Sequence, residues 1–406
     1  MQFATESKDP SLLPGTSSQI AEIGLIENLL ELKHFKKPQI QRRLAVYPYE
    51  SYAKKNELIC ELMKLLWPEQ VKIDLFSIYK DFDYFMTATG RKGHFIHQFE
   101  VFLLGLNLLL VLWKKKPNLS IFKAKSKEEL INIWLITATT HDCGYPLQIA
   151  PDIVNDLSNL CMKLNLKSLS DRFDSIKFKD LLKKEHELKG LVIRNKSQDE
   201  IISEYISIEI LMKIILKSNL KLSSDEIQKL IDKFVDDANH GYVSSIILCN
   251  ILLDVVINDL SDPNKFKDDW LFNKLNFIAG AISLHSLDIK DRKYIRKISF
   301  EDNPYAYILF LIDNIQDWSR AIVPNTKYAE YQLKDFNISD NELRLNYILS
   351  HDSWTAQVRE DAKKDILKRS AKLKCLPKLF SKFNYKINVS FQGDNLSEFP
   401  QIKMGM

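Results

Sequence analysis

The sequence predicts a mainly α-helical fold, in which a large helical bundle is followed by a small α+β appendage at the C-terminus. The chain has 406 residues, of which 45% are hydrophobic, and only 11 Gly and 13 Pro. It can therefore bury a sizeable core and has few residues that break helices. Apolar residues recur every three or four positions through most of the chain. After about residue 325 they alternate instead, which is typical of strands.

The helical part is expected at residues 18–324, after a flexible tail at 1–17 that is rich in Ser, Pro and Gly. Helical spacing predicts N-terminal helices at 18–32 and 50–67, with a loop or extended segment at 36–49 between them, and an aromatic-rich helix at 74–89. Ser223 or Ser224 is predicted to cap one of the later helices. The core helices are predicted near 93–114, 127–141, 148–164, 175–194, 199–218, 224–235, 240–259, 267–286 and 304–320.

The appendage is expected to be a strand–helix–strand unit over residues 325–406. Residues 342–348 alternate apolar and polar side chains, and residues 383–391 do so again. Between them, residues 357–372 form a charged stretch with helical spacing. Such a unit could serve oligomerisation or ligand sensing, or could cover the helical core.

Charge and cysteine content limit the possible partners and cellular location of the protein. The net charge of +4 is small for this length, so composition allows a nucleic-acid partner but does not indicate one. The five cysteines include no CxxC pair, which fits a reducing, cytoplasmic location. No signal peptide is expected, because the first 14 residues lack an apolar stretch. The most apolar window, Val101–Trp113, is too short to span a bilayer, so we expect a buried core helix and no membrane association.

The chemistry of the sequence centres on His141 and Asp142, which follow an apolar helix and precede Gly144 and Pro146, where that helix must end. A second pair, His351–Asp352, we interpret as incidental. Other histidines and aspartates lie within or at the edge of apolar helical stretches. In chain order they are His97, the His141–Asp142 pair, His240, His285 and Asp313.

A buried imidazole without a partner is costly, and a single one is usually a satisfied core residue. Here four of only eight histidines, together with two aspartates, occupy such positions. Imidazole and carboxylate groups suit divalent Fe, Mn, Co, Ni or Zn. The pattern therefore predicts a site for one or two transition-metal ions.

This order resembles that of the HD-domain metal-dependent phosphohydrolases, over roughly residues 90–320. The resemblance implies an HD-type helical bundle and a water nucleophile activated by metal. About a hundred residues between the His141–Asp142 pair and His240 have no clear counterpart in the family pattern. The resemblance implies one ion on His97, His141, Asp142 and Asp313. It implies a second ion on Asp142, His240 and His285, and a one-ion version stays open.

Further residues are candidates for contact with substrate. His94 shares a helix face with His97, so it is predicted either to donate a proton to substrate or leaving group or to orient a ligand. Arg91 and Lys92 precede it and could hold phosphate, or could simply begin a solvated helix. Arg320 could bind phosphate as well, or pair with Asp317.

The function that these observations predict is hydrolysis of a phosphate ester or anhydride bond in a small (deoxy)nucleotide, with Asp142 and His94 as catalytic residues. One alternative is a phosphodiesterase on cyclic nucleotides or single-stranded nucleic acid, which predicts a basic groove across the site. Another is an HD module that senses nucleotides without hydrolysing them, against which the intact ligand set argues. The expected partners are a small phosphorylated substrate and, in a homo-oligomer, a second copy of the chain.

Overall fold

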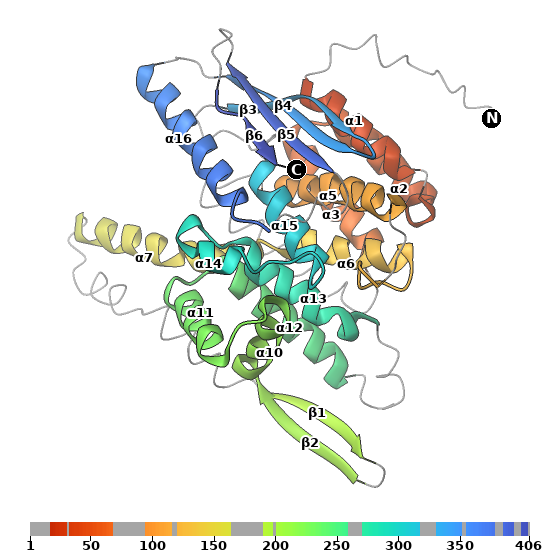
Figure 1. Ribbon diagram of the computed structural model, residues 1–406, viewed down its shortest axis with the longest axis vertical. Coiled ribbons are helices and arrows are strands. Elements are labelled where there is room, and N and C mark those ends of the chain that lie inside the picture. Colours follow the sequence, from red (N-terminus) through yellow and green to blue (C-terminus); the bar gives the residue numbers. More distant parts are fainter. Residues whose placement is uncertain are drawn as a thin grey trace.

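The helical body of the protein carries a sheet at one end and a projecting hairpin at the other (Figure 1). The fold is mainly α with a small C-terminal appendage, as the sequence predicts. The computed structural model describes residues 17–30, 32–67, 94–115, 120–163, 190–197, 200–258, 270–316, 330–350, 355–377, 385–393 and 399–404. The predicted tail up to Thr16 and the predicted helix at 74–89 lie outside these residues.

Three helices precede the core: α1 (Ser17–Leu30), α2 (Pro38–Val46) and α3 (Tyr52–Leu66). The prediction of a loop or extended segment at 36–49 was wrong, because this region contains α2. Pro38 occupies the first turn, where a missing N–H costs nothing. Ile40 and Leu44 lie one turn apart and are both buried, so a single apolar face stabilises this short helix.

Five core helices bring their ends together around one point: α5 (His94–Lys115), α6 (Lys127–Thr140), α12 (His240–Asn258), α13 (Trp270–His285) and α15 (Pro304–Ile315). Helix α13 packs against α6, α12 and α15, and α5 packs against α6 and α15. The surrounding helices are α7 (Tyr145–Lys163), α10 (Ile208–Leu220), α11 (Ser224–Asp236) and α14 (Arg292–Ile295), the last preceded by the 3-10 turn η5 (Ile289–Asp291).

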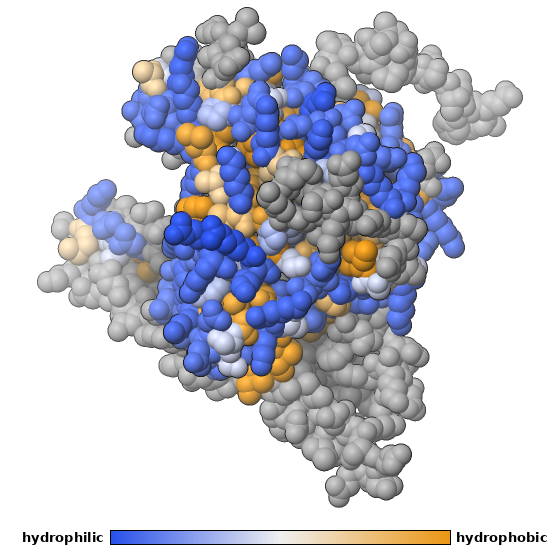
Figure 2. Space-filling model, in the orientation of Figure 1, coloured by the Kyte–Doolittle hydropathy of each residue, from blue (hydrophilic) through white to orange (hydrophobic). Residues whose placement is uncertain are grey.

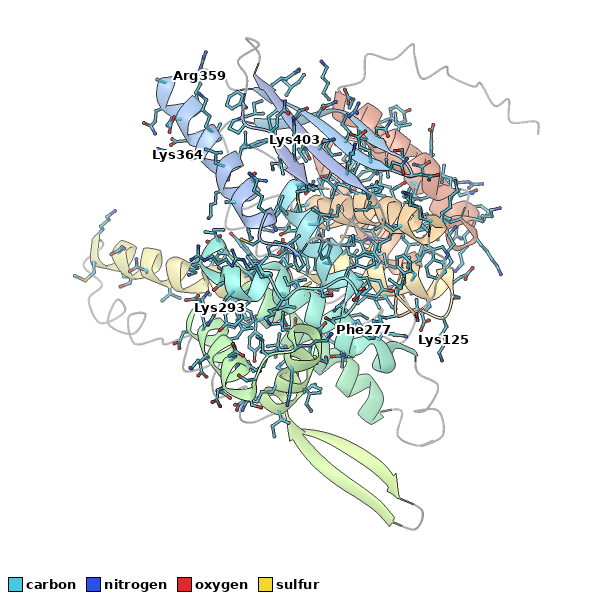
Figure 3. All side chains as sticks on the ribbon, viewed as in Figure 1. Lys125, Phe277, Lys293, Arg359, Lys364 and Lys403 are labelled. Atoms are coloured by element: carbon cyan, nitrogen blue, oxygen red, sulfur yellow. The ribbon has the colours of Figure 1, made fainter. Side chains whose placement is uncertain are left out.

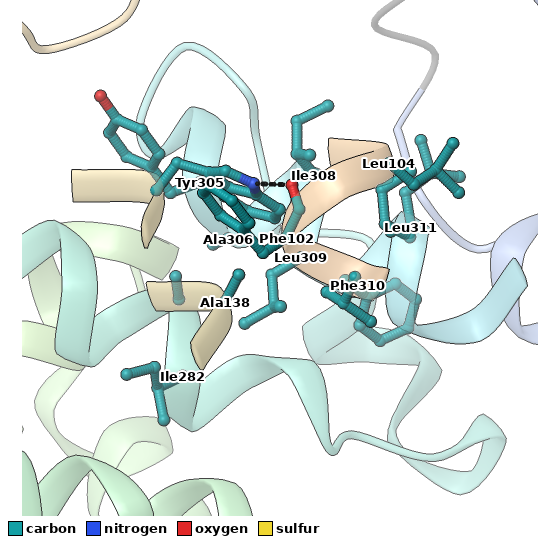
Figure 4. Packing of buried hydrophobic residues seen from close by; sticks show 14 of the residues in the cluster. Phe102, Leu104, Ala138, Ile282, Tyr305, Ala306, Ile308, Leu309, Phe310 and Leu311 are labelled. Carbon is teal, nitrogen blue, oxygen red and sulfur yellow. Dashed lines mark hydrogen bonds between the residues drawn. The ribbon is translucent and has the colours of Figure 1, made fainter. Parts of the chain in front are cut away.

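The α5–α6 contact is tight because Gly105 lies directly under Trp134. A Cβ at Gly105 would stand 2.0 Å from the Trp134 ring, so only glycine fits. The indole of Trp134 donates to the carbonyl of Phe102 at 2.9 Å, the dashed line in Figure 4. The expectation that this stretch is too short to span a bilayer was wrong, because α5 as a whole is 22 residues long and apolar enough to cross a membrane. The prediction of a core helix agrees with the structure, since 89% of its most apolar window is buried inside the protein.

Side-chain caps fix where several core helices begin. Ser126 caps α6 by accepting from the N–H of Glu129 at 3.1 Å. Ser223 and Glu226 form a capping box at the start of α11, which confirms the predicted cap there. Asn303 caps α15 ahead of Pro304. These caps pair backbone N–H groups that a helix start leaves without an intrahelical partner.

The prediction of an all-helical stretch up to residue 324 was wrong at one place. Strands β1 (Gly190–Ser197) and β2 (Glu200–Ser207) form an antiparallel hairpin where helices were predicted. Both strands are rich in β-branched residues, such as Val192 and Ile193 in β1. Short apolar runs fit a helix or a strand equally by spacing, so the β-branched content decides. The hairpin projects from α10 away from the body (Figure 1).

The C-terminal appendage contains more strands than the predicted two. A four-stranded sheet has the order β3 (Glu330–Ile338), β4 (Glu342–Ser350), β5 (Lys386–Gly393) and β6 (Ile402–Met404). Strands β4 and β5 pair in parallel, with Leu345 opposite Val389, and α16 (Ala356–Leu373) crosses between them. The other two pairs are antiparallel.

The appendage packs on the helical body. Helix α1 packs against β3, with Gly24 under the Phe336 ring. The hydroxyl of Tyr347 in β4 donates to the carbonyl of Ile315, the last residue of α15, at 2.6 Å. The hydroxyl of Tyr307 in α15 donates to the carbonyl of Pro377, just after α16, at 3.0 Å. Both ends of α15 are therefore fixed by the core and the appendage together.

Candidate metal centre

The six residues predicted as metal ligands converge at the ends of the five core helices. His97 lies in the first turn of α5, and Asp313 lies in the last turn of α15. His141 caps the C-terminal end of α6, and Asp142 follows it. The remaining two, His240 and His285, are the first residue of α12 and the last residue of α13.

The first half of the centre consists of His97, His141 and Asp313, and it faces the Oδ2 atom of Asp142. Asp313 Oδ1 lies 3.0 Å from His97 Nε2 and 3.6 Å from His141 Nε2. Asp142 Oδ2 lies 3.5 Å from His141 Nε2. The two histidines are 2% and 0% exposed, whereas Asp313 is 19% exposed. This half is therefore buried except at the edge formed by Asp313.

The second half consists of His240 and His285, and it faces the Oδ1 atom of Asp142. That oxygen lies 3.4 Å from His240 Nε2 and 3.5 Å from His285 Nε2. The two Nε2 atoms are 3.1 Å apart. His285 is 1% exposed and His240 is 19% exposed, so the second half opens to solvent at His240.

Asp142 divides its two carboxylate oxygens between these halves. The ligand atoms of His97, His141 and Asp142 all lie within 4.8 Å of one another, and so do those of Asp142, His240 and His285. Each buried group could hold a metal ion. A carboxylate with one oxygen toward each group is placed to bridge two cations.

All four histidines turn Nε2 into the centre and Nδ1 away from it. His141 Nδ1 donates to the carbonyl of Ala138 at 2.8 Å, and His285 Nδ1 donates to the carbonyl of Ile282 at 2.6 Å. A backbone carbonyl only accepts, so Nδ1 carries the proton in both residues. In the neutral imidazole each Nε2 then presents a lone pair to the centre, the tautomer that a metal ligand needs.

Two glutamines orient the other two histidines. His97 Nδ1 donates to Gln316 Oε1, and Gln316 Nε2 donates to the buried Glu100 carboxylate at 2.7 Å. Because Glu100 accepts there, the amide nitrogen of Gln316 must face it and the amide oxygen must face His97. His240 Nδ1 donates to Gln148 Oε1 at 2.5 Å. The outer hydrogen bonds therefore give all four histidines the same tautomer.

The inward-facing nitrogen and oxygen atoms are better placed to bind a divalent transition metal than to form hydrogen bonds with one another. Among the residues that the structure describes, the buried Nε2 of His141 has no hydrogen-bond partner. The Nε2 atoms of His240 and His285 face each other as two lone pairs, which repel at 3.1 Å. A cation placed between such nitrogen and carboxylate oxygen atoms would satisfy all of them.

The carboxylates make the centre attract positive charge. Burial would raise the pKa of Asp142 and of Asp313, but neighbouring histidines hold both pKa values well below the usual range, so both are ionised. Burial lowers the pKa of His141, but the two carboxylates outweigh it and raise this pKa to about 9. Burial lowers the pKa of His240 to about 3, which keeps that side chain neutral. In metal-free protein His141 is therefore protonated, and its positive charge balances the two carboxylates. A bound metal ion would take the place of this proton.

Two glycines let the helix ends approach one another. A Cβ at Gly241 would lie 2.5 Å from the carbonyl of Ile282 and 2.9 Å from the His285 ring. A Cβ at Gly144 would lie 2.4 Å from the carbonyl of His240. The start of α12 can therefore touch both α13 and the turn after Asp142 only because glycine occupies these positions.

His94 and Tyr145 form the rim of the centre beside Asp142. His94 Nδ1 lies 3.4 Å from Asp142 Oδ2, and its side chain is 19% exposed. The partly buried Tyr145 ring lies 4.7 Å from the His94 ring and 5.4 Å from the His240 ring. Both rim side chains border the centre and face solvent in part, so a molecule bound at the centre would contact them.

Three residues predicted to bind substrate, Arg91, Lys92 and Arg320, lie outside the described residues, and their roles stay predictions. The same holds for the His351–Asp352 pair.

Sequence reasoning missed Gln316, Gln148, Glu100 and Tyr145. A signal for Glu100 exists, because it is a charged residue within the most apolar helix of the chain. Gln316 follows Asp313 by three residues, which places it near the same helix face.

Comparison with protein-family models, with curated proteins and with solved structures finds no match to this chain. Its function is therefore inferred from the centre itself, that is, from four imidazoles with defined tautomers around a shared carboxylate.

Proposed function

We propose that the protein is a metal-dependent phosphohydrolase that uses water to cleave a phosphate ester or anhydride bond of a small (deoxy)nucleotide. The position of Asp142 carries this proposal, with Oδ1 toward His240 and His285 and Oδ2 toward His141. Two ions that share ligands at a separation of roughly 3.5–4 Å are a common arrangement in phosphatases and nucleases. The order of the ligands along the chain, which resembles that of HD-domain phosphohydrolases, supports the same conclusion.

When bound, one or two ions of Fe, Mn, Co, Ni or Zn would activate a water molecule and neutralise charge on the phosphoryl oxygens. His97, His141 and Asp313 would hold the first ion and His240 and His285 the second, with Asp142 on both. The outer hydrogen bonds of the histidines keep each Nε2 aimed at the centre and prevent the imidazoles from rotating.

The rim residues have separate roles in this proposal. His94 stands beside Asp142 and is partly exposed, so it can donate a proton to the oxygen of the leaving group. Tyr145 presents an aromatic ring between His94 and His240. A ring in this position can pack against the base or sugar of a nucleotide while the phosphate reaches the centre.

The test is a screen of metal-loaded protein against dNTPs, NTPs, cyclic nucleotides and dinucleoside polyphosphates, with product release as the readout. We expect turnover of at least one of these classes, loss of turnover with a chelator, and recovery when metal is restored. Tight nucleotide binding without any turnover would overturn the proposal in favour of a nucleotide-sensing module. No turnover, no nucleotide binding and no bound metal would overturn both the phosphohydrolase proposal and the nucleotide-sensing alternative.

A further inference from the structure

We propose that α14 and α16 together form a surface that binds the phosphodiester backbone of a single-stranded nucleic acid and directs the strand to the metal centre. This inference rests on the metal-dependent phosphohydrolase activity proposed above, and it extends the substrates of the same centre from small nucleotides to the phosphodiester bonds of a strand. The phosphodiesterase alternative predicts a basic groove near the site, and composition alone cannot show whether basic residues gather there.

Positive charge is concentrated in two short segments. Residues 288–299, which include α14, contain five Lys and Arg and two Asp, a formal charge of +3. Residues 356–374, which form α16 and its end, contain seven Lys and Arg and three acidic residues, a formal charge of +4. Their combined +7 exceeds the +4 of the whole chain, so the rest of the protein is slightly acidic. The small net charge therefore hides a local basic region.

Helix α16 lies against α15 and against the turn that follows α13, and both helices carry metal ligands. Lys368 pairs with Asp288 at 3.5 Å, and Asp288 follows the ligand His285 by three residues. One turn further along, the Lys372 ammonium lies 5.1 Å from the centre of the Phe310 ring. Phe310 precedes the ligand Asp313 by three residues on α15. The Asp313 carboxylate also contributes to the pKa of Lys372, which burial lowers. The basic face of α16 therefore borders the centre.

This face continues along α16 and onto α14. Lys364, Lys368 and Lys372 recur every four residues, so they share one side of the helix. Helix α16 contacts η5, the turn that leads into α14. In Figure 3, Arg359 and Lys364 lie on α16 and Lys293 lies on α14, all toward the same side of the molecule. Figure 2 shows hydrophilic side chains over both elements, with an apolar strip between them.

The cations of α14 are free to bind an anion. Arg292, Lys293, Arg296 and Lys297 are all exposed, and within the described residues none of them forms an ion pair. The nearby Glu226 instead accepts from the backbone and hydroxyl of Ser223. On α16 the Lys364–Glu360 pair is exposed and long, at 3.9 Å, and is therefore weak, whereas the half-buried Arg369–Asp365 pair at 2.9 Å would stay in place. Binding a polyanion would therefore displace little.

The spread of cations over two elements and the burial of the centre favour a single strand over other polyanions. Twelve Lys and Arg residues with a net charge of +7 on two segments exceed what the phosphates of one nucleotide can contact, so the surface fits a longer chain of phosphates. A duplex cannot bring a backbone phosphate to a centre whose ligand side chains are at most 19% exposed, whereas a single strand can enter. The apolar strip between the two basic elements offers a surface for unstacked bases.

The test measures binding of a fluorescent oligo(dT) of about 20 nucleotides to full-length, metal-loaded protein. Phosphorothioate linkages protect the strand from cleavage, and anisotropy is recorded at several salt concentrations. We expect the logarithm of the binding constant to fall linearly with the logarithm of the salt concentration, with a slope of about −0.7 for each phosphate contact. Changing Arg292, Lys293, Arg296 and Lys297 to Ala should weaken binding about tenfold or more and reduce the slope by about 3.

A matched control removes the same number of exposed cations elsewhere, through Lys33→Ala, Lys36→Ala, Lys37→Ala and Arg42→Ala. These residues lie in α2 or just before it, and Figure 1 shows α2 at the right of the molecule and α14 left of its centre. The control should bind the strand as the wild type does. Absence of strand binding, equal losses in the two variants, or a preference for anionic lipid vesicles would each overturn the inference. Metal content and hydrolysis of small nucleotides, measured on the wild type in parallel, show separately whether the proposed function fails.

Discussion

The two halves of the metal centre differ in how firmly their ligands are held. In the first half, His97 donates to Gln316, which is itself held by Glu100, and all three side chains are buried. In the second half, His240 is partly exposed and donates to Gln148, whose side chain faces solvent. A ligand that can relax toward water holds its ion less rigidly. We therefore expect the first half to bind its ion more tightly and the second half to exchange its ion.

The difference also indicates where substrate approaches. Asp313, His94 and His240 are each 19% exposed, whereas the other three histidines are nearly inaccessible. Tyr145 lies between His94 and His240. In the proposed function, substrate would therefore reach the centre from the side of the rim, and the buried imidazoles form its floor.

The largest effect is expected from Asp142→Ala, because Asp142 serves both halves. Removing it takes away the shared ligand and a negative charge that draws cations together, so hydrolysis should fall by at least about a thousandfold. Circular dichroism should show the helical content of the wild type. The matched control changes the second His–Asp pair, as His351→Ala with Asp352→Ala, and should keep near-normal activity. Parental activity in Asp142→Ala would remove the basis for the phosphohydrolase proposal.

An intermediate effect is expected from the outer glutamines, which offer a matched pair of substitutions. Gln316→Ala leaves the buried Nδ1 of His97 without its acceptor, and we expect a 10–100-fold loss of metal affinity, in line with outer ligands elsewhere. Gln148→Ala should cost less, because water can replace an exposed amide at His240. Competition titration with a metal-binding dye gives both affinities. Equal losses, or a larger loss in Gln148→Ala, would show that the halves do not differ as described.

A smaller effect, chiefly on stability, is expected from Gly241→Ala. The new methyl group would press on the carbonyl of Ile282 and on the His285 ring, so α12 must move away from α13. Overpacking of this kind costs about 1–3 kcal/mol, and the shift should weaken metal binding in the second half. Thermal unfolding and metal content measure the two consequences. Gly24→Ala is the control, since there the nearest atoms belong to the Phe336 side chain, far from the ligands.

Local patterns in the sequence predict much of the fold, and they fail where local structure is irregular or ambiguous. The helical core was predicted because its apolar residues follow a helical period over long stretches. Strand β3 was missed because a bulge near Asp335 interrupts its alternation, so its apolar residues are spaced by two and then by three. The β1–β2 hairpin was mistaken for helix because short apolar runs fit either period.

The candidate site was predictable only for residues whose type and position stand out in the sequence. Six histidines and aspartates stood out because they interrupt apolar helices, and the structure brings them together. Their outer partners did not stand out, because Gln148 and Gln316 contact histidines 92 and 219 positions away. Such contacts depend on how helices pack. The basic surface was hidden for the same reason, since only the fold places α16 beside the turn that leads into α14.

Metal content tests the central claim most directly, which is that Asp142 joins two ion sites in one centre. The protein and its His240→Ala variant are loaded with metal under reducing conditions, freed of excess ion, and measured by elemental analysis. We expect two ions per chain in the wild type and one in the variant, because His97, His141, Asp313 and Asp142 remain to hold the first. One ion per chain in both proteins would contradict the shared two-metal centre, and no ion in either would contradict a metal centre altogether.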